Sequence, residues 1–404
     1  MTSPPEPQAQ DTTPLQGPPR LASRLRGIQP FHVMALLARA KELEAQGRSI
    51  VHMEIGEPDF PTPQPVVAAA LKAVAAGDMH YLPALGMPAL RVAIARFYRD
   101  RYGVDVSPSR IVVTPGASGA LLLALSALVN AGDRVLMTDP TYPCNRHFVR
   151  MLEGEAVCIP VDAGTRYQLT SDLVRSSWDA RTVGVMIASP ANPTGTLIDM
   201  AVLAGIAAEV SERRGALIVD EIYHGLTYEA EARTVLEVYD DAFVINSFSK
   251  YFGMTGWRLG WVVAPERAVE ALDRLAQNVF LAASTPAQHA ALAAFAPETI
   301  EILEARRQAF RARRDYLVPA LASVGFEIAA RPEGAFYVYA GCGRFGRDGF
   351  ALAHELLERA GVAITPGIDF GEHRAKHHVR FAYTTSIENL QEGVRRLQAY
   401  LGNL

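Results

Sequence analysis

The segment at residues 247–261, SFSKYFGMTGWRLGW, contains residue types that could hold a phosphorylated aldehyde. Lys250 could form an imine with the aldehyde carbon. Ser247, Ser249 and Arg258 could bind the phosphate, since a planar guanidinium donates two parallel hydrogen bonds to its oxygens. The alternative is a loop with a solvated lysine and a structural arginine. The chain has only four lysines, so few other amines compete for this role.

The segment VDEIY (219–223) places Asp220 at the end of an expected strand, with Tyr223 three residues later. A carboxylate beside a pyridine nitrogen keeps that nitrogen protonated, so the ring can accept electrons. Tyr223 could donate a hydrogen bond to the phenolate oxygen of the same ring. The alternative for Asp220 is a cap on a following helix, which is a common role for aspartate.

Three more segments follow expected strands. TPGASGA (114–120) leads into a helix, and its small residues would let backbone amides approach a phosphate closely. Asn192 in SPANPTG could contact the phenolate oxygen, although an Asn-Pro pair is also common in turns. Tyr142 in DPTYP could stack on the cofactor ring or simply pack in its loop. No GxGxxG motif supports a dinucleotide cofactor.

Arg380 lies in HHVRFAYTT, which is expected to be a strand near the C-terminus. A buried arginine needs a partner, and a substrate carboxylate would supply one in the bidentate geometry that arginine favours. The alternative is an internal salt bridge. The basic and histidine-rich stretch at 373–378 matches no metal-ligand spacing, so we interpret it as a solvated loop and expect no metal.

The elements that would position these residues alternate along the chain. Helical stretches are separated by short β-branched runs, which predicts an α/β fold with a largely parallel sheet. The expected strands are IVVT (111–114), RVLMTD (134–139), VGVMIA (183–188), ALIVD (216–220), FVINS (243–247) and LGWVV (259–263). Several of them end at the polar segments above, and ligands of open α/β sheets bind at the carboxyl ends of the strands.

The domain organisation follows from the same pattern. Residues 1–23 are rich in Pro and Gln and predict a disordered leader. Residues 24–63, with a helix over 24–46, are expected to contribute to a small domain. The large cofactor-binding domain is expected at 64–295, and the small C-terminal α+β domain at 296–404, beginning with a long helix.

Composition limits the partners and the compartment. The net charge of −4 provides no basic stripe, which argues against nucleic acid and an anionic membrane as main partners. The three cysteines form no disulfide framework, and free thiols fit a reducing compartment. No apolar run is long enough to span a bilayer. We therefore predict a cytoplasmic protein.

Taken in chain order, these motifs resemble the class I and II aminotransferases of the fold-type I pyridoxal-phosphate family. The resemblance covers the chain from about residue 28 to its end, and its motifs are EIGEPDFPTP, YLPALGMPALR, TPGAS, DPTYP, SPANPTG, VDEIY, SFSKYFGMTGWRLGW and VRFAY. It implies a large domain with a mostly parallel seven-stranded mixed sheet, a small α+β domain and a homodimer with shared active sites. It also implies ping-pong transfer of an amino group from an L-amino acid to a 2-oxo acid such as 2-oxoglutarate or pyruvate.

The resemblance also implies residue roles. Lys250 would carry pyridoxal 5′-phosphate as an imine and move the proton at the substrate Cα, and Asp220 would pair with the pyridine nitrogen. Arg380, with Asn192 and the backbone of Gly56, would bind the substrate carboxylate. The other implied cofactor contacts are Tyr142, Asn192, Tyr223, Ser247, Ser249, Arg258, the backbone amides of Ala117 and Ser118, and Tyr81 from the neighbouring subunit.

These motifs do not identify the amino acid substrate. In an aspartate-specific branch of the family, a lysine of the phosphate loop receives the second carboxylate, and that position matches Ser118. An arginine such as Arg24, Arg26 or Arg146 could substitute, and the aromatic Phe31 would fit apolar donors equally well.

Two other functions share most of these motifs. A carbon–sulfur β-lyase would release a 2-oxo acid and ammonia without an acceptor. A non-catalytic ligand sensor would need an attached DNA-binding module, and the short leader cannot form a helix-turn-helix.

Overall fold

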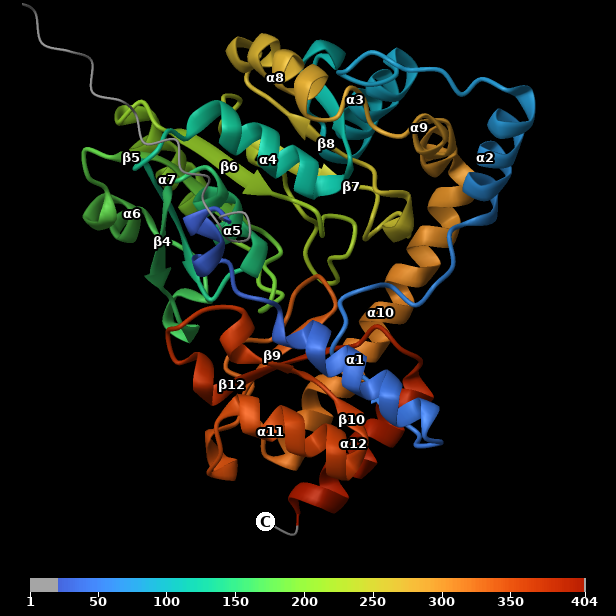
Figure 1. Ribbon diagram of the computed structural model, residues 1–404, viewed down its shortest axis with the longest axis vertical. Coiled ribbons are helices and arrows are strands. Elements are labelled where there is room, and N and C mark those ends of the chain that lie inside the picture. Colours follow the sequence, from blue (N-terminus) through green and yellow to red (C-terminus); the bar gives the residue numbers. More distant parts are fainter. Residues whose placement is uncertain (1–20, 403–404) are drawn as a thin grey trace, which may run out of the picture.

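A seven-stranded mixed sheet forms the centre of the protein, whose computed structural model describes residues 21–402 (Figure 1). The order of the strands is β2-β8-β7-β6-β5-β3-β4, and β8 is antiparallel to both of its neighbours while the other pairs are parallel. The expected α/β fold with a mostly parallel sheet is thus confirmed. The strands are β2 Ile111–Thr114, β3 Arg134–Asp139, β4 Glu155–Pro160, β5 Thr182–Ala188, β6 Ala216–Asp220, β7 Phe243–Ser247 and β8 Gly260–Val263.

One strand of this sheet, β4, is absent from the strands expected from the sequence. It pairs only with β3, at the edge of the sheet. Five of its six residues are half-buried or exposed, and they form no continuous apolar run. The strands inside the sheet are buried on both faces, which is why their apolar runs are readable in the sequence.

Helices cover both faces of the sheet and divide its side chains between two hydrophobic cores. Val135 and Met137 of β3 belong to one core, while Leu136 between them belongs to the other. The smaller core contains α4 Gly116–Leu128, α5 Pro143–Met151 and α8 Glu266–Val279. The larger core contains α2 Gln64–Ala76, α3 Pro88–Tyr102, α6 Ser171–Ser177, α7 Met200–Glu212 and α9 Thr285–Leu292.

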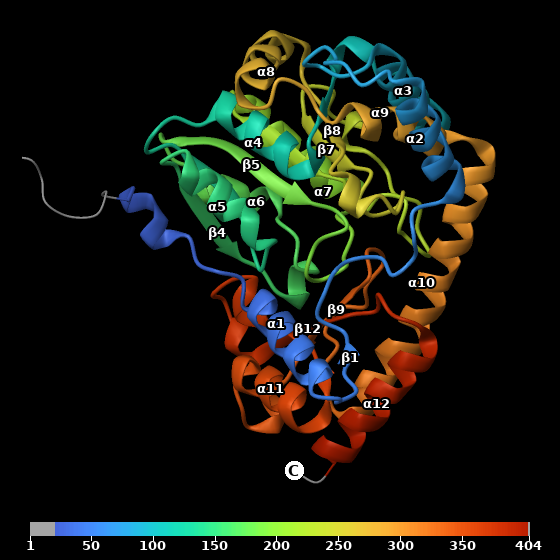
Figure 2. The ribbon, with the colours of Figure 1, turned by 45° about the vertical axis from the view of Figure 1, so that its right-hand side comes forward.

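The two ends of the described chain meet in a smaller α+β unit, below the large sheet in Figures 1 and 2. Its antiparallel sheet has the order β11-β12-β9, and β1 pairs in parallel with β10. The helix α10 Pro297–Val324 runs from the large sheet to this unit (Figure 2). The other elements are α1 His32–Ala45, β1 Val51–His52, β9 Tyr337–Gly341, α11 Gly349–Glu355, β10 Val362–Ala363, β11 Thr365–Pro366, β12 His378–Ala382 and α12 Ile387–Leu401.

The helix expected over 24–46 was wrong at its start. A 3₁₀ turn covers Ser23–Gly27, and α1 begins only at His32. Pro30 explains the break, because a proline disfavours the helical conformation of the residue before it. Residues 1–20 of the expected leader lie outside the described residues.

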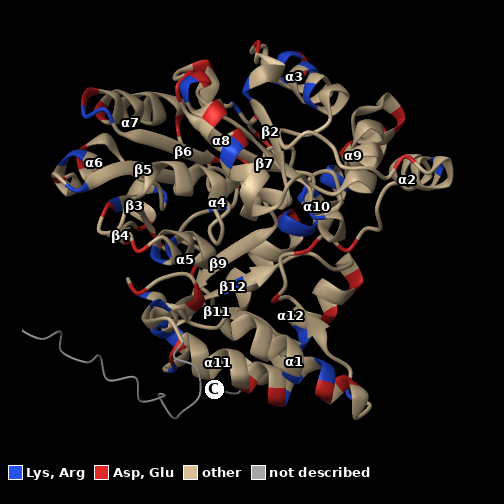
Figure 3. Ribbon diagram, turned by 45° about the horizontal axis from the view of Figure 1, so that its top comes forward, with Lys and Arg blue, Asp and Glu red and all other residues tan. Residues whose placement is uncertain are grey.

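Charges of both signs are interspersed on outer helices such as α3, α8 and α12 (Figure 3). Among the described residues, no helix is both long enough and apolar enough to cross a membrane.

Candidate active site

A cavity of about 790 Å³ lies at the carboxyl ends of the sheet strands, between the large sheet and the smaller unit. Loops that follow β2, β3, β5, β6 and β7 line it, together with β12 and the segment before α2. The cavity wall includes Gly56, Ala117, Ser118, Tyr142, Asn192, Asp220, Tyr223, Ser247, Ser249, Lys250, Arg258 and Arg380. These are the site residues expected from the sequence, with one exception. Tyr81 is 86% exposed and is not part of this wall.

Lys250 lies in the middle of the wall, three residues after β7. Its amine donates a hydrogen bond of 2.7 Å to the carbonyl oxygen of Gly56, and it lies 5.7 Å from the ring centre of Phe336. Desolvation by the surrounding protein lowers the pKa of Lys250 to about 8. An amine with this pKa loses its proton more easily than a solvated lysine and is therefore a better nucleophile near neutral pH.

Asp220 ends β6 and is 7% exposed. Burial raises the pKa of its carboxyl group to about 6, although a hydrogen bond from the backbone amide of Ile222 and the charge of Lys250 oppose the shift. A turn, not a helix, follows β6, so Asp220 caps no helix. A buried carboxylate of this kind is stabilised by a cationic ligand group in the cavity.

One end of the cavity has the properties of an anion site. The helix α4 begins there, and its N-cap residue Pro115 provides no side-chain hydrogen bond to the first amides. Gly116 has φ +74°, and a Cβ atom at that position would lie 2.6 Å from a guanidinium nitrogen of Arg258. The uncapped helix start and this guanidinium therefore lie side by side, next to Ser247 and Ser249. Such a combination binds phosphate well.

Arg380, 5% exposed, lies at another side of the cavity. Its guanidinium donates to the side-chain oxygen of Asn192 at 3.0 Å and to the carbonyl oxygen of Glu54 at 2.6 Å. The rings of Tyr337 and Phe370 lie 4.2 and 4.7 Å from its central carbon.

In the part of the chain that the structure describes, no carboxylate forms an ion pair with Arg380, and its Nε has no hydrogen-bond partner. The alternative of an internal salt bridge is thus not found. A buried cation that faces a cavity without a carboxylate partner is matched to an anionic group of a ligand.

Several residues of the site were not found from the sequence. The hydroxyl groups of Tyr337 and Tyr223 lie 2.9 Å apart. A Cβ atom at position 56 would lie 1.9 Å from the Tyr337 hydroxyl oxygen, so only glycine fits there. The alternation of EGAFYVYA could have indicated that Tyr337 faces one side of a strand. Glu54, Glu57, Asp369 and Phe370 also line the cavity.

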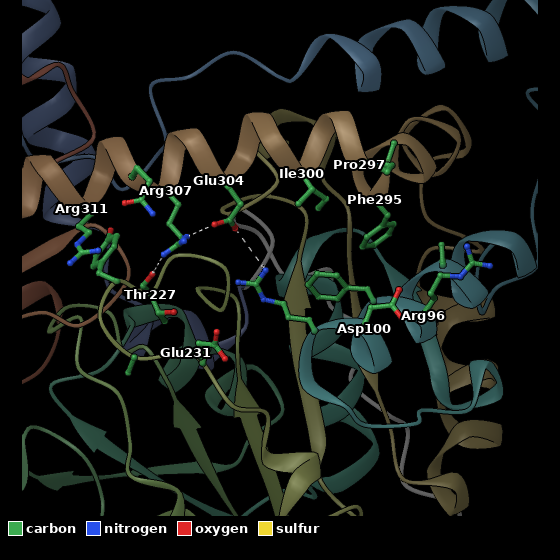
Figure 4. Close-up of a pocket in the computed structure, with 18 of the residues that line it drawn as sticks. Arg96, Asp100, Thr227, Glu231, Phe295, Pro297, Ile300, Glu304, Arg307 and Arg311 are labelled. Carbon is green, nitrogen blue, oxygen red and sulfur yellow. Dashed lines mark hydrogen bonds and ion pairs between the residues drawn. The ribbon is translucent and has the colours of Figure 1, made fainter.

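A second cavity, of about 880 Å³, lies between α3, α10 and the loop at 227–232 (Figure 4). Three of its charged groups pair with one another: Glu304 lies 2.6 Å from Arg307 and 3.9 Å from Arg101. Arg307 also donates to the carbonyl oxygen of Thr227. Lys250 and Asp220 both lie outside this cavity, and we assign no chemistry to it. The described residues contain no cluster of His, Cys, Asp and Glu that could hold a metal ion.

Comparisons with known proteins agree on one family. The family model described as Aminotransferase class I and II matches residues 48–397. A valine–pyruvate aminotransferase from Mycobacterium tuberculosis is 40% identical over 377 residues, covering 93% of this chain and 97% of that protein. A (5-formylfuran-3-yl)methyl phosphate transaminase from Methanocaldococcus jannaschii is 37% identical, covering 94% of this chain and 99% of the relative. The crystal structure of an aminotransferase from Mycobacterium tuberculosis superposes with a TM-score of 0.92 at 39% identity, covering 96% of this chain and 100% of that chain.

Proposed function

This chain belongs to the class I and II aminotransferases and transfers amino groups; from that premise we propose that it uses pyridoxal 5′-phosphate, bound in the 790 Å³ cavity. The amino group passes from an L-amino acid to a 2-oxo acid, with 2-oxoglutarate and pyruvate as the acceptors to consider. We also propose that the protein acts in the cytoplasm as a homodimer. Its three cysteines are free, which fits a reducing compartment.

The residues of the cavity fit this cofactor. The uncapped start of α4 and the guanidinium of Arg258 would hold the phosphate, together with Ser247 and Ser249. The buried carboxylate of Asp220 would pair with the pyridine nitrogen. Tyr223 and Asn192 would contact the ring oxygen, and Tyr142 would stack on the ring. When bound, the cofactor supplies an aldehyde that links covalently to amines and a protonated ring that accepts electrons from Cα.

Three residues of the protein would have separate roles in the reaction. Lys250 would hold the cofactor until a substrate amine takes its place. Its free amine would then take the proton from the substrate Cα at Nζ and donate it to the aldehyde carbon of the cofactor. Asp220 keeps the ring nitrogen protonated. Arg380 fixes the substrate carboxylate, because its two terminal nitrogens meet two carboxylate oxygens at once, and thereby orients Cα toward Lys250.

One observation carries this proposal: a lysine with a lowered pKa and a buried arginine without a carboxylate partner line the same cavity. A covalent link to an amine and a bound carboxylate are the two things an amino acid substrate requires. The relatives above are named as aminotransferases, and nothing favours the β-lyase or the ligand sensor.

The proposed function predicts two separate half-reactions. We expect an amino donor, added without acceptor, to remove the visible absorption of the bound cofactor. A 2-oxo acid added afterwards should restore it, because the amino group leaves with the acceptor. Stopped-flow absorbance and product analysis would measure both steps. Release of ammonia with no need for an acceptor would instead indicate a lyase, and a protein that binds no cofactor would contradict the proposal.

Exposed apolar side chains on α2 and on two neighbouring segments support the proposed homodimer. These side chains are Leu71 and Val74 of α2, Met79 and Tyr81 after α2, Val279 at the end of α8, and Leu281 between α8 and the start of α9. Thr285 at the start of α9 donates to the carbonyl oxygen of His80, so the segments 78–86 and 279–284 lie together. Exposed apolar side chains on segments that lie together are typical of an interface.

Shared sites can be tested by mixing two inactive variants. If Tyr81 serves the neighbouring subunit, a Tyr81→Ala chain and a Lys250→Ala chain form mixed dimers with one intact site. We expect such mixtures, after subunit exchange, to regain roughly a quarter of the wild-type number of sites. Tyr81→Phe is the matched control, because it removes only the hydroxyl group and keeps the aromatic ring. An activity equal to the average of the two separate variants would contradict sharing.

A further inference from the structure

Once the cofactor and the substrate carboxylate have their partners, the charged groups that remain in the cavity wall are all negative. The basic groups of the described cavity wall are Lys250, Arg258 and Arg380, and each has a role in the proposed function. The acidic groups other than Asp220 are Glu54, Glu57 and Asp369. No cation of this wall therefore remains for a second carboxylate of a substrate.

Two of these acidic groups have hydrogen-bond partners at the cavity wall. Glu57 accepts a hydrogen bond of 2.6 Å from Thr255. Glu54 is fully buried, and one of its carboxylate oxygens lies 2.7 Å from Nδ1 of His52 while the other has no partner. Glu54 is paired with His52 and Glu57 is exposed, and neither group provides a positive charge for a second carboxylate of a substrate.

Asp369 has a structural task that also shapes the cavity. The first amides of α1 lack a cap from Phe31, and both oxygens of the Asp369 carboxylate accept hydrogen bonds from them, at 2.9 Å from His32 N and 3.0 Å from Val33 N. This contact holds the start of α1 against the cavity. Phe31, Val33 and Met34 become part of the wall as a result.

The wall built in this way is apolar. The rings of Phe31 and Tyr142 are stacked, with centroids 6.4 Å apart and planes at 27°. Leu121 and Ile222 also line the cavity. An apolar side chain gains about 25 cal/mol for each Å² it buries against such a surface, whereas a carboxylate loses its hydration there without a partner.

No other arginine of the described chain compensates. Of the three candidates from the sequence, Arg24 pairs with Glu153 and Arg146 donates to the backbone carbonyl of Asp369. Neither of them, nor Arg26, lines the cavity. The segments 78–86 and 279–284, which would approach the site from a second subunit, contain no lysine or arginine.

We infer that the side-chain subsite accepts apolar or aromatic side chains and rejects a second carboxylate. This rests on the proposed function, because it assigns Lys250, Arg258 and Arg380 to the cofactor and the shared carboxylate. Donor and acceptor use one site in ping-pong transfer, and we expect the same preference for both. The donors are amino acids such as leucine, valine or phenylalanine, and the acceptor is pyruvate or another monocarboxylic 2-oxo acid.

The first measurement compares donors and unreactive ligands on the cofactor-loaded wild-type protein. We expect kcat/KM to be at least about tenfold higher for leucine or phenylalanine than for aspartate or glutamate. Calorimetry should show the same preference for hydrocinnamate over maleate, which tests binding without turnover. Equal or better use of aspartate and maleate would overturn this inference and leave amino transfer intact. A protein that reacts with no amino acid would instead overturn the proposed function.

A matched pair of variants then locates the subsite. Phe31→Arg supplies the missing cation, and Phe31→Leu keeps the position apolar. We expect Phe31→Arg to shift the aspartate-to-leucine ratio of kcat/KM by about tenfold or more toward aspartate, and Phe31→Leu to shift it much less. If both variants give the same ratio, the side chain is received elsewhere and the inference fails. The maleate affinity of each variant, measured by calorimetry, separates this effect from general loss of activity.

Discussion

Replacing Lys250 with alanine is expected to lower kcat by about 10⁴-fold or more, because one amine performs two tasks. In the proposed function it holds the cofactor covalently and moves the proton at Cα. Steady-state kinetics give the first readout. Borohydride reduction followed by peptide mass analysis gives the second, and we expect the cofactor on the Lys250 peptide of the wild type and on no peptide of the variant.

The matched control is Lys41→Ala, which removes an exposed lysine of α1 far from the cavity wall. It should keep wild-type activity. A Lys250→Ala protein that still turns over at more than a few per cent of the wild-type rate would show that another group moves the proton.

The same lysine predicts a pH dependence. Only the neutral amine attacks an aldehyde, and the pKa of Lys250 is lowered from 10.5 to about 8. The rate at which cofactor-free protein takes up pyridoxal phosphate should therefore rise as the pH increases toward about 8 and level off above it. A rate that keeps rising to pH 10 or higher would indicate a lysine with an ordinary pKa.

The sequence was sufficient to predict the site residues whose position depends on the end of a single strand. Asn192, Asp220 and Lys250 each follow an apolar β-branched run, and parallel strands bring their carboxyl ends to one edge of the sheet. The motif around each residue is local, and so is the backbone geometry that presents it. This is why the expected residues, apart from Tyr81, line one cavity.

The rest of the site depends on contacts between distant segments. Asp369 reaches the first amides of α1 across 337 positions, and no local pattern marks an aspartate that caps a helix so far away. The position of Glu54 follows from the pairing of β1 with β10. Two-residue strands of this kind carry almost no periodicity. Tyr81 stays a prediction, because its proposed task requires a second subunit.

Replacing Asp220 with asparagine is expected to have two opposite effects. Catalysis should fall by about 10²- to 10⁴-fold, because the loss of one partner of a buried charged pair costs about 3–5 kcal/mol. The amide keeps the shape and still accepts the hydrogen bond from Ile222. The loss therefore reports the charge on Asp220 and not its volume, and Asp220→Glu, which keeps the charge, should recover part of the activity.

The cofactor-free Asp220→Asn protein should in contrast be more stable than the cofactor-free wild type. Burial raises the pKa of Asp220 from 3.8 to about 6, so the folded protein holds this proton more tightly than the unfolded chain. The stability that this proton contributes is present below pH 3.8 and is lost as the pH rises through about 6. At pH 7 the buried charge then destabilises the wild type by up to about 3 kcal/mol. We expect the variant to gain in Tm between pH 4 and pH 7, as measured by calorimetry without cofactor. A Tm difference that does not change with pH would mean that Asp220 is solvated in the cofactor-free protein and that its pKa is not raised by burial.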